Sequence, residues 1–451
     1  MVEAYGATAV VLGAGIAGLG AAQVLSERFS RVVVIERDAL PQGPAGRSGL
    51  PHGEHTHGLL AVGRESLERL FPGLSAELVD RGAVWMDIGR ELAVWQLGGF
   101  RAGFDCTVKV VNVSRSLLEW CLRRRLAGLG NVEVRQAAAA GLAGAGDRVT
   151  GVRLAGGATV SSDLVVDATG RGTRSDRWLA QLGLPVPTES TIGVRLAYST
   201  LLLHREGGDL GGLRMVAQLQ TPPSGKRLGG AMAIDGDRWI VTLGEFHNDH
   251  PPADRASFVE FAASLPHPSI AQLIESAEPL SEVAVIQFPA SRRRHFERMR
   301  RLPAGYLAVG DALCSFNPVY AHGMTVAAVE ALALGRFLDR HRGSGPDMAR
   351  AFYRHVTGVV GSAWELARSV DFAYPQTTGR RPVGFALRDR YLRRVIRAAQ
   401  TSPKLNHRLM HVYHLIDRPH VLAAPDLLLT TVKATRKSAP DTADTPLPTP
   451  S

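Results

Sequence analysis

The sequence has few cysteines and no long apolar run. Cys106, Cys121 and Cys314 are widely spaced among 451 residues and form no CxxC pair, which argues against a disulfide framework or a cysteine zinc site. We therefore expect a reducing, cytoplasmic compartment. No apolar segment approaches the ~20 residues that a membrane-spanning helix needs. The first apolar run is short and has no basic leader, so we expect no signal peptide.

Lysine is also scarce, because only five lysines contribute to a net charge of +10. The excess lies near the C-terminus, where residues 380–437 hold 13 Lys and Arg against three Asp. This basic segment is either the solvated face of terminal helices or a surface for an acidic carrier protein, a reductase or a membrane. No recognition motif accompanies the charge, so nucleic acid is not expected.

The clearest motif spans Thr8 to Arg37, where an apolar run, a glycine-rich turn, a helical stretch and a second apolar run follow one another. Gly13 allows the turn, Gly15 lets the backbone approach a pyrophosphate, and Gly18 lets the helix lie close to the strand. Amides at the helix start then bind the phosphates. Glu36 ends the second strand, where its carboxylate accepts hydrogen bonds from an adenosine ribose. The motif predicts a dinucleotide site and leaves NAD and FAD open.

A loop rich in glycine and histidine follows, from Arg47 to His57. Its histidines, His52, His55 and His57, have loop spacing and no carboxylate or thiolate partners, so we expect no metal. We expect this loop to lie over a bound cofactor, with Arg47 near phosphate or flavin.

Ser114 is the expected N-cap of a helix whose apolar face includes Leu117 and Leu118. Arg115 falls in its first turn, where the helix dipole disfavours a cation that has no anion to contact. Arg115 therefore either contacts a cofactor or forms a structural salt bridge.

Farther along the chain, residues 163–170 are expected to form a buried strand that runs into a second glycine turn. Residues 192–288 have the strand and turn pattern of a mostly β substrate domain. Residues 306–311 form another apolar strand ending in Gly-Asp, and a helix is expected from about 324 to 338. The tail, residues 438–451, is rich in Pro, Thr and Ala and is expected to be disordered.

Four segments together resemble the flavoprotein monooxygenases of the para-hydroxybenzoate hydroxylase fold. They are GAGIAG with Glu36, the helix that Arg115 opens, VVDATGRGTRSD at 165–176, and YLAVGDALCSFNPVYAHGMTVAAVEALAL at 306–334. Within that superfamily, RSGLPHGEHTHGLL and GDALCSFNPVYAHGMTVAA are similar to the epoxidases of bacterial polyether biosynthesis, of the lasalocid and monensin type. The arginine-dominated basic set suggests a GC-rich, actinobacterial genome.

The resemblance implies an α/β fold, with a Rossmann-type FAD-binding domain, an interleaved mostly β substrate domain and a C-terminal helical region. The expected FAD-binding domain is discontinuous and comprises residues 1–75, 106–190 and 289–340. The expected substrate domain comprises residues 76–105 and 191–288. A C-terminal helical region is expected at 341–437 and the disordered tail at 438–451.

The resemblance also implies cofactor contacts. It implies that Gly13, Gly15 and Gly18 bind the pyrophosphate of FAD. Glu36 would bind the adenosine ribose, and Asp311 would bind the ribityl hydroxyls. A helix N-terminus beside the isoalloxazine stabilises negative charge on the reduced flavin. The expected cofactor-binding residues are Gly13, Gly15, Gly18, Glu36, Arg37, Arg47, Arg115, Asp311, Pro318, Gly323 and Met324.

Two departures from the family pattern bear on chemistry. Thr169-Gly170 stands where the hydroxylases have Asp-Gly, and Asp167 is two residues early and would point elsewhere. NAD(P)H then reduces the flavin either directly or through a separate reductase. Ala321-His322-Gly323 replaces Gly-x-Gly, which makes His322 a candidate catalytic base. Its alternative role is a structural hydrogen bond to nearby backbone.

The activity implied is that of an FAD-dependent monooxygenase, in which a flavin hydroperoxide delivers one oxygen of O2 to an apolar natural-product intermediate. Alkene epoxidation is the first choice, because it needs only a positioned alkene and excluded water. Aromatic hydroxylation and alkene reduction of the geranylgeranyl-reductase type are the alternatives. The Trp-x-Trp-x-Ile-Pro signature of flavin halogenases is missing. Four aromatic residues either line an apolar pocket or belong to the core: Tyr198, Trp239, Phe246 and Tyr320.

Overall fold

The computed structural model describes residues 5–47, 49, 51–248, 250–341, 345–434 and 445–449. One half of the molecule is built on a five-stranded parallel sheet in the order β16-β10-β1-β2-β6. Its central strands are apolar and fully buried, as expected for a parallel sheet covered on both faces. The strands are β1 (Gly6–Leu12), β2 (Phe29–Glu36), β6 (Val132–Gln136), β10 (Leu164–Asp167) and β16 (Tyr306–Ala308).

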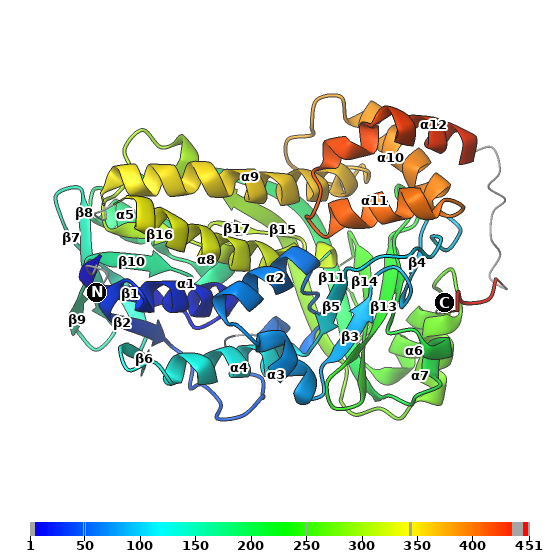
Figure 1. The fold of residues 1–451 in the computed structure, drawn as a ribbon, viewed down its shortest axis with the longest axis horizontal. Coiled ribbons are helices and arrows are strands. Elements are labelled where there is room, and N and C mark those ends of the chain that lie inside the picture. The colour runs from blue at the N-terminus through cyan, green and yellow to red at the C-terminus, as the bar shows by residue number, and fades with distance from the viewer. Residues whose placement is uncertain are drawn as a thin grey trace.

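Three helices pack around this sheet beside the glycine turn. α1 (Ile16–Ser26) follows β1 directly and packs against α8 (His322–Arg340) and α4 (Arg115–Ala127). A Cβ atom at Gly20 of α1 would lie 3.0 Å from the Ala331 Cβ, so α1 and α8 approach closely. Figure 1 shows α8 between α1 and α9 (Pro346–Asp371). The expected helix at about 324–338 is α8, which begins two residues earlier.

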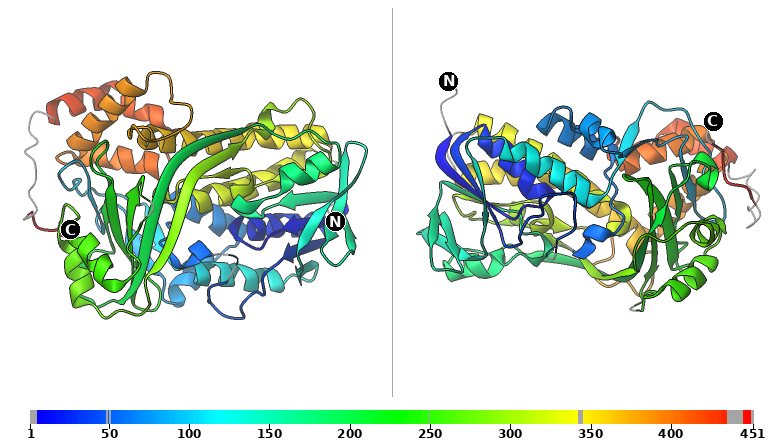
Figure 2. Two further views of the ribbon diagram at one scale, coloured as in Figure 1. Left: turned by 180° about the vertical axis from the view of Figure 1, so that it is seen from behind. Right: turned by 90° about the horizontal axis from the view of Figure 1, so that it is seen from below.

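A seven-stranded mixed sheet forms the second half, in the order β17-β15-β11-β14-β13-β12-β4. Residues alternate along it: Leu201 and Val241 pack against the helices α6 and α7, whereas Thr200 and Thr242 lie on the other face. Figure 2 shows β11 and β15 as long strands that join the two halves. The elements are β4 (Leu92–Trp95), β11 (Glu189–His204), β12 (Met215–Gln218), β13 (Arg227–Ile234), β14 (Arg238–Phe246), α6 (Arg255–Ala263), α7 (Ser269–Ser276), β15 (Ala284–Arg294) and β17 (Cys314–Ser315).

Smaller elements connect the two sheets and extend the first. β3 pairs with β5, and β7, β8 and β9 form an antiparallel three-stranded sheet. No helix in the described ranges has both the length and the apolar character needed to cross a membrane. These elements are α2 (Ala61–Leu70), α3 (Leu74–Asp80), β3 (Val84–Asp87), β5 (Lys109–Asn112), β7 (Ala139–Ala145), β8 (Arg148–Leu154), β9 (Thr159–Ser161) and α5 (Ser175–Gln181).

The C-terminal helices cover the place where α2 and α8 begin. The backbone N–H of Ala61, the first residue of α2, donates to His414 Nδ1 at 3.1 Å, and that of Leu60 donates to Thr325 Oγ1 at 3.1 Å. The helices are α10 (Phe385–Ala399), α11 (Pro403–Tyr413) and α12 (Pro425–Ala434).

The predicted α/β fold class, with a parallel-sheet half, a mostly β half and C-terminal helices, is confirmed. The expectation of a disordered tail is wrong for residues 445–449. The Thr445 carbonyl lies 2.8 Å from His267 Nε2, and Leu447 packs on the apolar cluster around α6 and α7. Burial of the apolar Leu447 side chain stabilises the contact between this segment and the second half of the molecule. The rest of the predicted tail, 438–444 and 450–451, lies outside the described residues.

Candidate functional site

In the glycine turn after β1, Gly13 and Gly18 have no room for a side chain, whereas Gly15 has open space beside it. Gly13 has φ +96°, and a Cβ atom there would lie 2.6 Å from the Ala168 carbonyl oxygen. A Cβ atom at Gly18 would lie 1.9 Å from the Gly13 carbonyl oxygen. At Gly15, the N-cap of α1, the nearest atom to a Cβ would be Arg115 Nη2 at 3.7 Å. Gly15 therefore leaves free access to the start of α1, where a phosphate can approach the amides.

Two half-buried arginines converge on that open side. Arg115 donates from Nε to Glu119 Oε1 at 2.8 Å, and Arg47 lies 3.4 Å from Glu119 Oε2. Ser114 caps the helix as predicted, accepting from the Leu117 amide. Arg115 thus forms the salt bridge that we considered, and its guanidinium still faces Gly15. The two guanidinium groups, which pair with Glu36, Asp38 and Glu119, lie with the α1 N-terminus at this open side of the turn.

Glu36 ends β2 beside the same turn. Its Oε2 accepts from the Ala14 amide at 2.8 Å and from Arg47 Nη1 at 3.0 Å. Arg37 is exposed, with its Nε 3.8 Å from Asp38. A carboxylate that is next to the phosphate-binding amides, at the carboxyl end of a strand, is where a Rossmann fold binds ribose.

A cavity of about 510 Å³ begins at this turn and extends to the face of the seven-stranded sheet. Gly18 and His322 are not among the residues that line it, whereas Tyr198 and Phe288 of the sheet are. Of the four aromatic residues considered, only Tyr198 lines the cavity, and Trp239 and Phe246 are core. The lining residues of the predicted set are Gly13, Gly15, Glu36, Arg37, Arg47, Arg115, Asp311, Pro318, Gly323 and Met324.

The Gly-Asp segment and the start of α8 form the middle of this cavity. Asp311 faces it, and burial raises the pKa of this carboxyl, while Arg115 and Arg171 oppose the shift. Ala321 is the N-cap of α8 with φ +54°, a left-handed conformation that is costly for alanine. Ala321, Gly323 and Met324 all line the cavity, so the N-terminal end of α8 is directed toward a ligand there.

Glu330, one residue that sequence reasoning missed, supports the Gly-Asp segment from behind. It is fully buried on α8, and its Oε2 accepts from the Gly310 amide at 2.5 Å. Burial raises the pKa of Glu330 to about 8. Its position about two helical turns beyond Gly323 provided no recognisable signal.

Asp167 points away from the cavity, as its early position predicts. It accepts hydrogen bonds from the Thr169 amide at 2.9 Å, from the Thr173 hydroxyl at 2.6 Å and from the Tyr306 hydroxyl at 3.1 Å. Thr169 and Arg171 line the cavity in its place. Asp167 therefore organises the turn internally, and it also accepts from the Thr169 hydroxyl at 2.6 Å, while Arg171 donates to the Ala290 carbonyl at 2.6 Å.

His322 lies outside the cavity lining. Its ring is buried, with centroids 6.2 Å from Phe316, 6.1 Å from Tyr320 and 6.1 Å from Tyr413 of α11. The Tyr413 backbone interacts with the ring and partly opposes the effect of burial on the pKa of His322. Burial lowers the pKa of His322 to about 4, so the ring is neutral. His322 therefore does not face the cavity, and its contact with the Tyr413 backbone agrees with the structural alternative.

The histidine loop instead supplies a chain of hydroxyls. Thr56 lines the cavity, and its Oγ1 lies 2.8 Å from Thr242 Oγ1. Thr242 Oγ1 lies 2.6 Å from Thr200 Oγ1, which lies 2.7 Å from His55 Nδ1. Burial lowers the pKa of His55 to about 4, so this histidine is neutral. These four groups connect the cavity to a buried imidazole.

The other histidines of that loop do not form a cluster around His55. His57 lines the cavity, and its Nδ1 lies 2.8 Å from the His55 carbonyl oxygen. The side chain of His52 lies outside the described part of the chain. Among the described residues, no group of three or more His, Cys, Asp or Glu is arranged to bind a metal ion.

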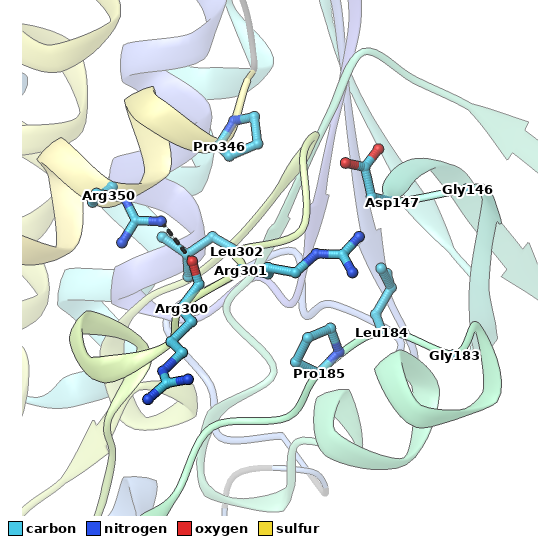
Figure 3. A pocket seen from close by; sticks show the side chains of 10 residues that line it. All are labelled: Gly146, Asp147, Gly183, Leu184, Pro185, Arg300, Arg301, Leu302, Pro346 and Arg350. Carbon is cyan, nitrogen blue, oxygen red and sulfur yellow. Dashed lines mark hydrogen bonds between the residues drawn. The ribbon is translucent and has the colours of Figure 1, made fainter.

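A second pocket of about 260 Å³ lies at the β7–β8 turn and the start of α9 (Figure 3). It contains three arginines, but Arg350 donates to the backbone carbonyls of Met299 and Arg300. Figure 3 shows the Arg300 side chain directed away from Arg301. These arginines do not converge on one point, so the larger cavity is the candidate site.

Comparison with known proteins identifies a relative in sequence. The chain is 31% identical to Protein Rv3254 from Mycobacterium tuberculosis over 443 residues, which cover 93% of this chain and 92% of that protein. No protein-family model matches the chain.

Solved structures match the fold at low sequence identity. A flavoprotein/dehydrogenase from Cytophaga hutchinsonii has a TM-score of 0.68 at 16% identity, covering 96% of this chain and 98% of that one. The flavin-dependent brominase Bmp2 has a TM-score of 0.64 at 14% identity, covering 96% and 98%. The 2-methyl-3-hydroxypyridine-5-carboxylic acid oxygenase has a TM-score of 0.61 at 18% identity, covering 80% and 90%. The chain therefore has the fold of these flavoproteins.

Proposed function

The chain belongs to the same family as Protein Rv3254 of Mycobacterium tuberculosis, and from that premise we propose that it is an FAD-dependent monooxygenase. Its substrate is an apolar natural-product intermediate, and the reaction adds one oxygen atom from O2. The observation that carries the proposal is the single cavity that joins the glycine turn of α1, the N-terminus of α8 and the apolar side chains Tyr198 and Phe288. The shared fold with a flavin-dependent brominase and a pyridine-carboxylic acid oxygenase supports it.

The residues of the cavity fit FAD better than NAD. Arg47, Arg115 and the α1 amides would hold the pyrophosphate, and Glu36 the adenosine ribose. Asp311 is farther along the cavity, where it would hold ribityl hydroxyls, and a nicotinamide nucleotide has no group that needs it there. When bound, FAD supplies the chemistry of reduction by NAD(P)H and reaction with O2.

The protein has three tasks in this chemistry. The amides of Gly323 and Met324, in the first turn of α8, stabilise negative charge in front of them. Tyr198 and Phe288 position an apolar substrate and exclude water. Epoxidation of an alkene requires nothing more, which makes it our first choice of reaction.

Aromatic hydroxylation is the second candidate, and the hydroxyl chain favours it. A phenol is activated when its proton is removed. A phenol oxygen beside Thr56 would hydrogen-bond to this chain, which runs through Thr242 and Thr200 to the neutral His55 and would position the phenol. An alkene makes no use of such a chain.

The turn at Thr169 bears on which molecule reduces the flavin. Because Asp167 is engaged within its own turn, the acidic contact that serves NADPH in the hydroxylases is missing here. We therefore propose that a separate reductase is a partner, with direct reduction by NADPH as the alternative. Exposed Arg390, Arg394 and Arg397 on α10 offer a basic surface to such a protein or to an acidic carrier. Arg393 is instead paired with Asp389 at 2.8 Å.

One experiment tests these points in sequence. We would record the visible spectrum of the purified protein, add NADPH without oxygen, and then measure O2 consumption with polyene and phenol substrates. We expect a flavin spectrum, O2 uptake coupled to substrate, and an epoxide product. A protein that binds no flavin would refute the proposal, and saturation of the alkene without O2 uptake would identify a reductase.

A further inference from the structure

The loop before α8 is held in a costly conformation at the middle of the cavity. It spans residues 317–321, and Pro318 and Ala321 line the cavity. Ala321 has φ +54°, which a residue with a Cβ atom adopts only when its surroundings impose it. A Cβ atom at Gly58 would lie 2.8 Å from the Ala321 Cβ, so this side of the loop has no spare room. The loop therefore needs an anchor on its other side.

Asp371, the last residue of α9, is that anchor. Its Oδ1 accepts from Asn317 Nδ2 at 3.0 Å and from the Tyr320 hydroxyl at 2.7 Å. Asn317 begins the loop and Tyr320 nearly ends it, so one carboxyl oxygen binds both ends. The Asn317 side chain also accepts from the Val319 amide at 3.2 Å, which fixes the middle of the loop.

The surroundings of Asp371 make its charge state variable. It is completely buried, and it lies at the C-terminal end of α9, where the helix dipole disfavours a carboxylate. Burial raises its pKa to about 7, and the hydrogen bonds from Tyr320 and Asn317 oppose that shift. The phenols of Tyr320 and Tyr374 are the titratable groups that face it, and their own pKa values are raised by burial. Asp371 is therefore ionised above about pH 7 and protonated below it.

We propose that Asp371 is a positioning residue for the cofactor, which holds the 317–321 loop, and with it the first turn of α8, against the flavin ring. The inference rests on the proposed FAD site. Asp371 acts through Asn317 and Tyr320, since it is not among the residues that line the cavity. Ionisation strengthens both hydrogen bonds, because a charged acceptor binds its donors more tightly than a neutral one.

The test compares Asp371→Asn and Tyr320→Phe with the control Tyr374→Phe. Tyr374 is also buried, lies three residues beyond Asp371, and donates to the Gly225 carbonyl at 2.8 Å, away from the loop. For each protein we would measure the Kd for FAD by fluorescence, the flavin absorption band from about pH 5.5 to 8.5, and thermal unfolding.

We expect the flavin band of the unaltered protein to shift with a midpoint near pH 7, and Asp371→Asn to abolish that component. Tyr320→Phe removes a bond that lowers the pKa of Asp371, so its midpoint should move to higher pH. Its Kd for FAD should rise about tenfold, as expected for loss of one charged hydrogen bond. Tyr374→Phe should lower thermal stability without changing the spectrum or the Kd.

One outcome would overturn the proposed role of Asp371, and a different outcome would overturn the proposed function. If Asp371→Asn titrates like the unaltered protein and Tyr320→Phe binds FAD equally well, Asp371 has only a structural role. If the unaltered protein binds no FAD, the proposed function fails instead. Because Asn and Phe preserve the shape of the residues that they replace, both variants are expected to fold.

Discussion

At the end of the cavity beside α1, ion pairs position charged side chains, whereas beside the second sheet hydroxyl groups and neutral histidines make most of the contacts. One charged group there, the Arg171 guanidinium, lies 4.3 Å from the centroid of the Phe288 ring. Glu36 and Glu119 hold Arg47 and Arg115 through ion pairs of 2.8 to 3.4 Å. At the other end, His55 and His322 are buried and neutral, and hydroxyl groups make the contacts. The first end suits a charged, invariant part of a cofactor, and the second suits an apolar substrate and an O2-dependent reaction from which water is excluded.

The largest expected effect is at the charged end. Arg115→Gln removes a cation that faces Gly15, and we expect the Kd for FAD to rise about tenfold to a hundredfold, as for loss of charged hydrogen bonds. Added salt should weaken FAD binding in the unaltered protein more than in the variant, because ions screen the lost attraction. Titration of the apoprotein with FAD at two salt concentrations measures both effects. The exposed Arg69→Gln is the control, and an unchanged Kd for Arg115→Gln would exclude a phosphate contact.

An intermediate effect is expected at the neutral end. Thr242→Val interrupts the chain between Thr56 and Thr200, so a phenol loses the hydrogen bonds that position it and its turnover should fall about tenfold or more. Turnover of an alkene should not change, nor should salt dependence. Product formation from 2-naphthol and from a polyene distinguishes the two reactions. Ser199→Ala, on the opposite face of the sheet in the neighbouring strand β11, is the control, and equal losses with both substrates would indicate damage to the sheet instead.

The smallest effect concerns stability and pH. The pKa of Glu330 is about 8 in the folded protein against 4.5 in its ordinary state, so between these values only the folded state keeps the proton. Stability from this group therefore falls as pH rises from about 4.5 to about 8. Glu330→Gln retains an oxygen for the Gly310 amide, and we expect its unfolding free energy to exceed that of the unaltered protein increasingly across this window. Urea unfolding at several pH values measures the difference, and parallel curves would contradict it.

The charged end was largely predictable from sequence because its signals are local. Gly13, Gly18 and Glu36 lie within one strand-helix-strand unit, and Ser114 and Arg115 open one helix. Glu119 was missed, although it lies four residues after Arg115 and an acid at that spacing pairs with an arginine on a helix. Local patterns thus identified the positions and left one partner unassigned.

The neutral end was not predictable, because its contacts join distant segments. His55 lies 145 residues before Thr200, and Thr56 lies 186 residues before Thr242. Asp371 and Glu330 belong to no motif, and their roles depend on burial that only the fold creates. His322 was singled out for its place in a motif, yet its ring lies among aromatic side chains that include Tyr413 of α11. Sequence position alone does not determine on which side of a helix N-terminus a side chain lies.

The bond from Ala61 to His414 has a consequence for how the protein is made. The first amide of α2 finds its acceptor 353 residues later in the chain, in the C-terminal helices. Chains emerge from the ribosome N-terminus first, so the parallel sheet and the glycine turn are translated long before α11 exists. The hydrogen bond at the start of α2 therefore forms only after the C-terminal helices have been made. A nascent chain that lacks α11 has the phosphate-binding turn but cannot yet make this bond, so the start of α2 should become fixed only after α11 has emerged.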